Sequence, residues 1–243
     1  MNTALARTEE NDPAQVNAML AELDARERVR WVLGNLSGPF AVSSSFGAQS
    51  AVALHMVNAE CPGIPVILVD TGYLFAETYQ FADQLAERLR LNLHVVQSPM
   101  SPAWFEARYG RLWESGVDGI GRYNELRKVE PMRRKLAQLG VRTWFAGLRR
   151  AQSRSRATLL PLSTQDGRWK ACPLYDWTDR MVFDYLREHD LPYHPLWHKG
   201  YVSIGDWHTT RTLAEAGDAE ATRFFGLKRE CGLHQLPDLP EGL

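Results

Sequence analysis

The feature that most constrains the fold is a short apolar run, Pro-Val-Ile-Leu-Val-Asp at residues 65–70, with turn residues on both sides. A continuous apolar run of this length is typical of a strand buried on both faces, as strands of parallel sheets are. Further strand-like segments lie at residues 40–46, 93–96, 143–148 and 168–174. We therefore expect a central sheet whose two faces are both covered.

Helical patterns separate these strands. Apolar residues recur at helical spacing within residues 13–36, 49–59, 77–89 and 178–189 and through much of 103–140. Strands that alternate with helices predict an α/β fold with a doubly wound, mostly parallel sheet. Ligands of such folds bind outside the carboxyl ends of the strands.

Composition indicates an ordinary folded protein, with 243 residues, 44% of them hydrophobic and 23% charged. We expect an N-terminal helical segment (1–36), a ligand-binding α/β domain (37–210) and a mobile C-terminal tail (211–243). The net charge of -1 argues against a general binder of nucleic acids or membrane surfaces. No run of about 18 apolar residues predicts a membrane span, and residues 1–12 carry no signal-peptide pattern.

Two segments that follow predicted strands suit an anionic ligand. Residues 43–50 offer small residues, serine hydroxyls and a helix N-terminus to a phosphate, although they match no G-x-x-x-x-G-K-[ST] loop. Residues 147–156 carry four arginines, whose forked guanidinium groups match phosphate and sulfate oxygens. Each segment also allows a plainer interpretation, as a Ser-rich turn and as a solvated charged loop.

Other polar residues point less clearly to a ligand. Asp70, at the end of the apolar strand, either contacts a nucleoside or caps a helix. His194, His198 and His208 lie in a Pro/Gly-rich loop without acidic or cysteine companions at ligand spacing. No metal site is therefore predicted.

The three cysteines lie far apart, which fits a reducing cytoplasm better than a disulfide framework. Cys61 and Cys172 sit in a turn and an apolar stretch, and we expect both to be inert packed thiols. Cys231 follows Lys228 and Arg229, and neighbouring cations favour the nucleophilic thiolate. This near-terminal segment could close over a substrate and then swing out to a partner. The alternative is a free cysteine in a frayed tail.

Taken together, these segments resemble the phosphoadenylyl-sulfate (PAPS) reductase family. The matching stretches, in the order of the family, are Ser-Ser-Ser-Phe-Gly (43–47), Val-Asp-Thr-Gly-Tyr (69–73), Lys-Val-Glu-Pro (128–131), Trp-Phe-Ala-Gly-Leu-Arg-Arg (144–150) with Gln152 and Ser153, Tyr-His-Pro-Leu-Trp (193–197) and Phe-Phe-Gly-Leu-Lys-Arg-Glu-Cys-Gly-Leu-His (224–234). The ordered set, with its terminal Glu-Cys-Gly-Leu-His, covers nearly all of the chain after the N-terminal helical segment.

The resemblance implies an adenine-nucleotide α-hydrolase-like fold of the PP-loop type, a homodimer and a sulfonucleotide substrate attacked by Cys231. Residues of the substrate site, carried over from the motifs or placed near them, are Ser43, Ser44, Ser45, Gly47, Asp70, Lys128, Arg149, Arg150, Gln152, Arg211, Arg223, Lys228, Arg229 and His234. His234 could orient the thiolate, donate a proton or pair with a carboxylate.

A related branch, the adenylyl-sulfate (APS) reductases, holds a [4Fe–4S] cluster through a Cys-Cys pair and a Cys-x-x-Cys pair. This chain has Tyr123-Asn124 at the first place and Asp206-Trp-His-Thr209 at the second. Without those thiolates we expect no iron–sulfur cluster and no other bound cofactor. Within the resemblance, this points to the 3′-phosphorylated substrate.

The expected chemistry is the two-electron reduction of the sulfuryl group to sulfite through a Cys231 thiosulfonate. A second thiol must release the sulfite, so we expect thioredoxin or glutaredoxin as the partner. Three alternatives remain: an ATP-pyrophosphatase-type adenylating enzyme of the same fold, a redox-sensitive adenylate-binding module, and a cluster-free APS reductase. The loop of the adenylating enzymes typically reads Ser-Gly-Gly-x-Asp-Ser, whereas this chain has Ser-Ser-Phe-Gly-Ala-Gln-Ser, with no acid to hold Mg²⁺ at that place.

Overall fold

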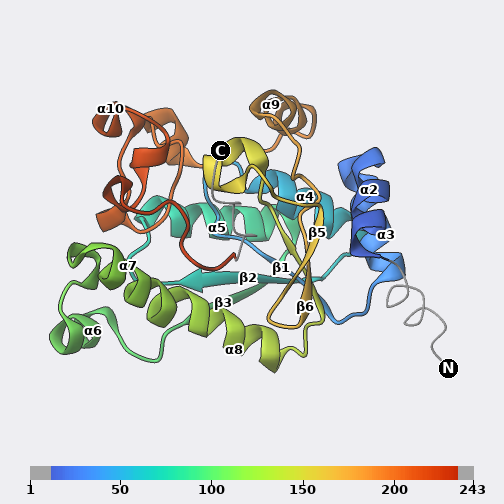
Figure 1. Cartoon of the computed structure of the whole chain (residues 1–243). Coiled ribbons are helices and arrows are strands. Elements are labelled where there is room, and N and C mark those ends of the chain that lie inside the picture. The colour runs from blue at the N-terminus through green and yellow to red at the C-terminus, as the bar shows by residue number, and fades with distance from the viewer. Residues whose placement is uncertain (1–11, 235–243) are drawn as a thin grey trace.

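The computed structural model describes residues 12–234 and arranges them around one mixed sheet (Figure 1). Within these residues the strands lie in the order β3-β2-β1-β4-β6-β5. Neighbouring strands run parallel except for β5, which pairs with β6 in the antiparallel direction. The bounds are β1 (Phe40–Ser43), β2 (Pro65–Asp70), β3 (Asn92–Gln97), β4 (Thr143–Ala146), β5 (Leu162–Gln165) and β6 (Arg168–Ala171).

The predicted α/β fold with a mostly parallel sheet is confirmed, and β2 has the predicted bounds. Strands β1, β4 and β6 end two or three residues earlier than predicted, because the residues that follow them belong to loops and no longer pair with a neighbouring strand. Sequence analysis missed β5, a short, partly polar edge strand. Its signal was the turn Asp166-Gly167, in which both residues have positive φ (50° and 70°) as a two-residue hairpin requires.

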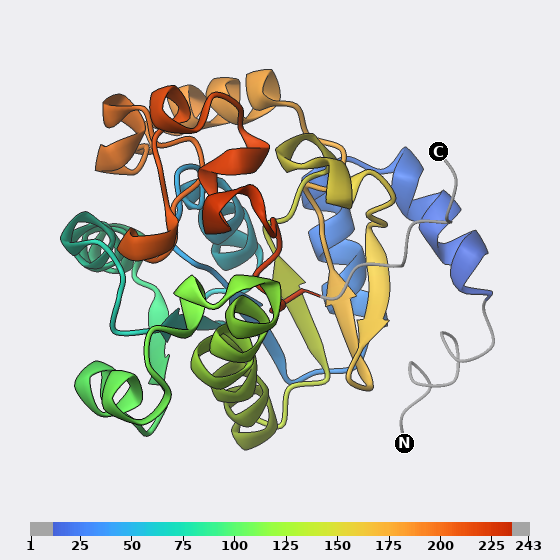
Figure 2. The same ribbon diagram turned by 60° about the vertical axis from the view of Figure 1, so that its left-hand side comes forward.

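Helices cover both faces of the sheet, as Figure 2 shows. Strand residues Val42, Val66 and Phe145 pack in the largest core cluster with the helices of the first face, whereas Ala41 and Ile67 pack against α8 on the second. The helices of the first face are α2 (Pro13–Glu22), α3 (Ala25–Asn35), α4 (Ala51–Glu60), α5 (Ala76–Leu89) and α9 (Asp179–Glu188), and α8 spans Glu130–Gln138. No helix in the described part of the chain is both long and apolar enough to cross a membrane.

The N-terminal segment forms two helices that belong to the same core as the sheet. Leu23 is the C-cap of the first, and Asp24 begins the second, since it forms a capping box with Glu27 at 2.8 Å in both directions. The buried Arg28 of α3 donates to both carboxylate oxygens of Asp176 at 2.7 Å. This bidentate pair attaches α3 to the loop that follows β6.

The chain between β3 and β4 forms α6 (Pro102–Tyr109), α7 (Gly116–Asn124) and a continuous helical path into α8. The junction of α7 and α8 is a π-helical turn, η2 (Glu125–Val129), which precedes Pro131 at the start of α8. Proline donates no N–H and its ring collides with the carbonyl four residues earlier, so the helix widens there. Both Arg127 and Lys128 in this widened turn are buried.

Candidate active site

The three segments predicted to bind a ligand follow neighbouring strands in the structure. Strands β2, β1 and β4 are neighbours, and Ser43 at the end of β1 lies level with Ala146 at the end of β4. The serine loop, the turn after Asp70 and the arginine segment therefore leave the sheet at the same edge. Parallel strands bring their following loops together in this way, although the loops lie far apart in sequence.

The serine loop is folded against its own backbone. The Ser44 hydroxyl accepts from the Phe46 N–H at 3.0 Å, and Phe46 itself adopts a left-handed φ of 49°. A side chain at Gly47 would lie 3.4 Å from the Ser45 hydroxyl. The Ser50 hydroxyl, at the start of α4, is buried and has no partner among the described residues. This arrangement places the unpartnered Ser50 hydroxyl at a helix N-terminus, where the helix dipole favours an anion.

Asp70 braces the turn that follows β2. Its carboxylate accepts from the Gly72 N–H at 2.7 Å, the Tyr79 hydroxyl at 2.7 Å and the Gln97 amide at 2.5 Å. It does not cap α5, whose N-cap position is Phe75. With three donors on it, Asp70 fixes the course of residues 70–72.

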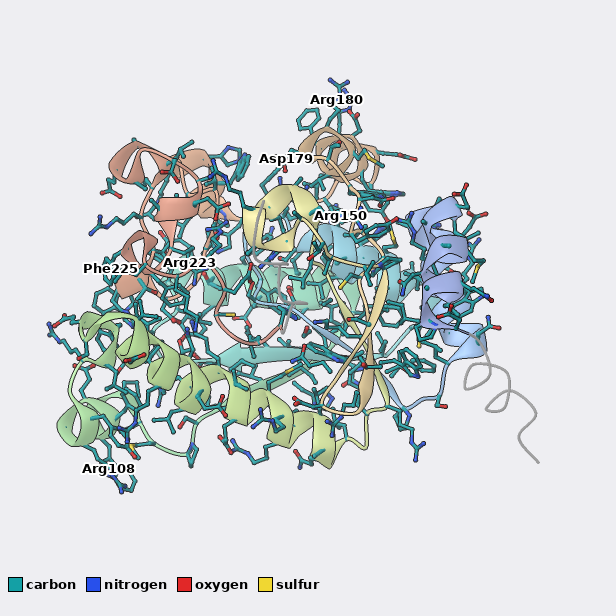
Figure 3. All side chains as sticks on the ribbon, in the orientation of Figure 1. Arg108, Arg150, Asp179, Arg180, Arg223 and Phe225 are labelled. Atoms are coloured by element: carbon teal, nitrogen blue, oxygen red, sulfur yellow. The ribbon has the colours of Figure 1, made fainter. Side chains whose placement is uncertain are left out.

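The arginine segment divides its side chains between the interior and the surface. Arg149 is buried and forms an ion pair with Asp179 at 2.8 Å. Arg150, labelled with Asp179 in Figure 3, is exposed and lies 4.7 Å from the centre of the Tyr175 ring. Gln152 accepts from the Arg149 N–H at 3.1 Å. Arg149 thus braces this segment from inside, and the exposed Arg150 also donates to the Leu159 carbonyl at 2.8 Å.

Lys128 lies at the centre of a buried polar network. Its ammonium group is 2.5 Å from the carboxylate of Asp206, and both side chains are almost fully buried. Asp206 also accepts from the hydroxyls of Thr71 at 2.5 Å and Tyr123 at 3.0 Å. Burial would raise the pKa of Asp206, but the charge of Lys128 and the hydrogen bonds from Lys128 and Thr71 hold it below its ordinary value.

The network includes Tyr123 and Asp206, which stand at the two positions where the resemblance places the cysteine pairs of the APS reductase branch. Tyr123 and Asp206, from the two sequence positions, are in hydrogen-bond contact. Thr209 packs beside them and donates to the Asp206 carbonyl, and Asn124 is buried. The side chains at these positions offer oxygen and nitrogen atoms, whereas an iron–sulfur cluster is held by cysteine thiolates.

Cys231 lies in a tail segment that packs on the domain. Figure 2 shows the last described residues, in dark red, between α7 and α8 on one side and the sheet on the other. Cys231 is partly exposed. The carboxylate of Glu230, immediately before it, forms an ion pair with Arg156 at 2.8 Å. Two residues after it, Leu233 packs against the core cluster of α8.

The basic residues of the tail contact different parts of the domain. Arg223, shown beside Phe225 in Figure 3, lies over Gly205, where any side chain would overlap its guanidinium group. Arg229 donates to the Gln152 carbonyl at 3.1 Å and so joins the tail to the arginine segment. Arg211 lies farther out, 5.2 Å from the Phe225 ring, and the Lys228 ammonium group lies near Gly121 of α7.

Sequence analysis missed four residues that organise this site: Arg156 as an individual residue, Lys170, Asp206 and Glu230. Arg156 and Glu230 contact each other across 74 positions, and Asp206 contacts Tyr123 across 83, so local patterns carry no signal for these three residues. Lys170 acts through Gln165, across the hairpin that sequence analysis missed. Asp206 was visible only as the residue that replaces a cluster cysteine.

The fold and site together define an α/β protein of the adenine-nucleotide α-hydrolase-like class. A structure of Candida glabrata FMN adenylyltransferase shares this fold, with a TM-score of 0.59 over 83% of this chain and 72% of that one, at 14% identity. The family model described as the phosphoadenosine phosphosulfate reductase domain matches residues 39–212. The chain belongs to this family.

Relatives agree with this assignment along most of the chain. Proteins named phosphoadenosine 5′-phosphosulfate reductase from Enterobacter sp. (strain 638) and Vibrio parahaemolyticus are each 60% identical over 91% of this chain, which covers 91% and 86% of them. The crystal structure of PAPS reductase from Candida auris, a phosphate complex, has a TM-score of 0.71 at 31% identity. That match covers 82% of this chain and 95% of the other.

Proposed function

We propose that this chain reduces 3′-phosphoadenylyl sulfate to sulfite and adenosine 3′,5′-bisphosphate in sulfate assimilation. The observation that carries the proposal is the placement of Cys231, partly exposed, in a segment tied to the arginine loop at the ligand-binding edge. Family membership supports the same reaction. The substrate is polyanionic, and arginine and lysine side chains are the groups that neutralise such charge.

In the first half-reaction, the Cys231 thiolate attacks the sulfuryl sulfur. An S–S bond forms to give a cysteine thiosulfonate, and the sulfur–oxygen bond to the nucleotide breaks. The electron pair of that bond leaves with adenosine 3′,5′-bisphosphate. Cations at the edge stabilise the charge that develops on the leaving phosphate.

In the second half-reaction, a dithiol of the thioredoxin or glutaredoxin type supplies the two electrons. Its first thiolate attacks the Cys231 sulfur, and sulfite leaves with the electron pair of the S–S bond. Its second thiol then resolves the mixed disulfide and restores the Cys231 thiol. The chain itself offers no resolving thiol: burial raises the pKa of Cys172 to about 11 and also raises that of Cys61. A reductant of this type is available in the cytoplasm, where we place the reaction.

The substrate-binding groups of the proposal are those at the edge and in the tail. The serine loop holds a phosphate, Asp70 fixes the adjoining turn, and Lys128 is aimed by Asp206. The remaining members of the proposed site are Arg150, Gln152, Arg211, Arg223, Lys228, Arg229 and His234, with Arg149 as an internal brace.

The side chains of Tyr123 and Asp206 in the network around Lys128 stand where the APS reductase branch is expected to have cluster cysteines. Because neither is a thiolate, the network favours the 3′-phosphorylated substrate over APS. We further propose a homodimer, on the strength of the resemblance alone. Sedimentation of the purified protein tests that part separately.

Intact-protein mass measurement tests the reaction. Reduced protein mixed with PAPS should gain the mass of one sulfonate group on Cys231, and thioredoxin should remove it with release of one sulfite. A Cys231→Ser variant is the control that binds nucleotide without an adduct. An adduct with APS alone would reassign the substrate. Nucleotide binding without any adduct would refute the thiosulfonate step and favour a binding module.

A further inference from the structure

The two faces of the sheet are covered differently at β4, β6 and β5. On the first face these strands pack in the large apolar core. On the second face, α8 covers the neighbouring strands, while Trp144, Lys170 and Gln165 lie side by side through the register Trp144↔Lys170 and the bond from Lys170 to Gln165 at 2.9 Å. The tail covers this part beside α8, through Leu233, which packs with the α8 cluster, and His234, which stacks on Trp144.

The segment before Cys231 is anchored by a charged contact. Arg156 donates to both carboxylate oxygens of Glu230 at 2.8 Å, and the hydroxyls of Ser155 and Ser153 donate to the same carboxylate at 2.8 and 3.2 Å. The side chains of Arg156 and Glu230 are only 16% and 17% exposed. Burial would raise the pKa of Glu230, but the contact with Arg156 holds it at about 2.

The segment after Cys231 is anchored as well. The Gln165 amide donates to the Leu233 carbonyl at 3.0 Å. The His234 ring stacks on Trp144 with 5.4 Å between centres and 14° between planes. Gly232, between these anchors and Cys231, has a φ of 80°. Backbone with such a φ is natural for glycine and lets the chain turn between its two anchors.

We propose that Ser153, Ser155, Arg156, Gln165, Lys170 and Trp144 form a tail-docking site that holds Cys231 in place for sulfuryl transfer, with Arg156 as its main positioning residue. The inference rests on the proposed function. The composition of the docking site supports it, because a sheet face covered permanently is normally apolar. Polar side chains tolerate exposure to water when the tail leaves to meet the reductant.

A rival explanation treats the Glu230 carboxylate as a stand-in for a substrate anion at Arg156 and the two serines. That explanation gives no role to the contacts at Leu233 and His234, which continue the same docked path beyond Cys231. It also makes the opposite prediction for the substrate. Removing the Glu230 charge would then strengthen substrate binding, whereas loss of an anchor leaves binding unchanged and slows transfer.

Trypsin cleavage after Lys228 and Arg229 measures docking without any turnover. In Arg156→Gln, loss of the bidentate, charge-assisted pair should raise the cleavage rate by about tenfold or more. Arg180→Gln is the matched control, since it breaks an arginine–carboxylate pair with Asp184 at 2.7 Å on the exposed outer side of α9 (Figure 3). Its cleavage should match the wild type. Equal cleavage of Arg156→Gln and wild type would overturn the proposal.

Single-turnover kinetics then separate positioning from binding. Arg156→Gln and Glu230→Gln should form the Cys231 adduct about tenfold more slowly at saturating PAPS, with unchanged substrate affinity and an undiminished release step with thioredoxin. Tighter PAPS binding by Glu230→Gln would establish the rival instead. If wild type forms no adduct, the proposed function fails, while the cleavage assay still tests docking. Glu230→Gln lies in the tail, so it tests docking even if Arg156→Gln fails to fold.

Discussion

The buried pair of Lys128 and Asp206 makes the strongest prediction for a single substitution, Asp206→Asn. The Asp206 side chain is fully buried, the Lys128 side chain is 7% exposed, and their charged atoms are 2.5 Å apart. An asparagine has nearly the same shape but no charge, so it leaves the ammonium group of Lys128 uncompensated in the interior. Loss of one partner of a buried pair costs about 3–5 kcal/mol. This is a large part of the about 5–15 kcal/mol that stabilises a typical domain.

Urea unfolding followed by circular dichroism measures the effect. Asp184→Asn is the matched control, because the same change there affects exposed pairs with Arg180 and Arg187. We expect a loss of less than about 1 kcal/mol for the control. A second variant with Lys128→Met added to Asp206→Asn should recover part of the stability, since no unpaired charge is left. A loss below about 1 kcal/mol for Asp206→Asn alone would refute the argument, because the pair would then be solvated.

The pH dependence gives a second signature of the same pair. The pKa of Asp206 is lowered in the folded state, so its contribution is present above the unfolded value of about 3.9 and is lost as the pH falls through the folded pKa. The difference in stability between wild type and Asp206→Asn should therefore be constant near neutral pH and shrink below about pH 4. A difference that grows on acidification would have the wrong sign.

Two further predictions concern the tail. Burial, with the charges of Lys170 and Arg156, lowers the pKa of His234 to about 3, so docking should weaken as the pH falls below the free value of about 6.5. The rate of tryptic cleavage of wild type, divided by that of His234→Phe, should therefore rise as the pH is lowered from 7.5 to 5.5. A constant ratio would contradict this. Gly205→Ala should displace the guanidinium group of Arg223, and the loss of one charge-assisted contact should raise the KM for PAPS by about tenfold. The midpoint of unfolding should not change. An unchanged KM would remove Arg223 from the substrate site.

The fold was predictable because its signals are local. An apolar run such as residues 65–70 has one stable environment, and strands alternating with helices leave few topologies. The same reasoning located the edge where the three loops meet. It failed at β5, whose four residues form a strand only because β6 offers them a partner across a tight turn.

Side-chain roles at the site were harder to predict, because they depend on which way a side chain turns. Arg149 and Arg150 are adjacent, yet the first is buried and pairs with Asp179, whereas the second is exposed. In the sequence, Glu230 is recognisable only as a negative charge next to Lys228 and Arg229. In the structure it binds Arg156, 74 positions earlier. Contacts across such distances follow from the completed fold, and a single sequence does not encode them in any local spacing.

The covering of the sheet connects fold to mechanism. A cysteine that must meet a small nucleotide and then a protein reductant cannot remain enclosed through both reactions, and it needs a defined position in the first. Apolar packing would make departure expensive, at about 25 cal/mol for each Å² exposed. The hydrogen bonds of Glu230 with Arg156 and the two serines can instead be exchanged for water at a small net cost, because water satisfies the same donors and acceptors. The polar part of the second sheet face is therefore what allows a covering segment to be both ordered and releasable.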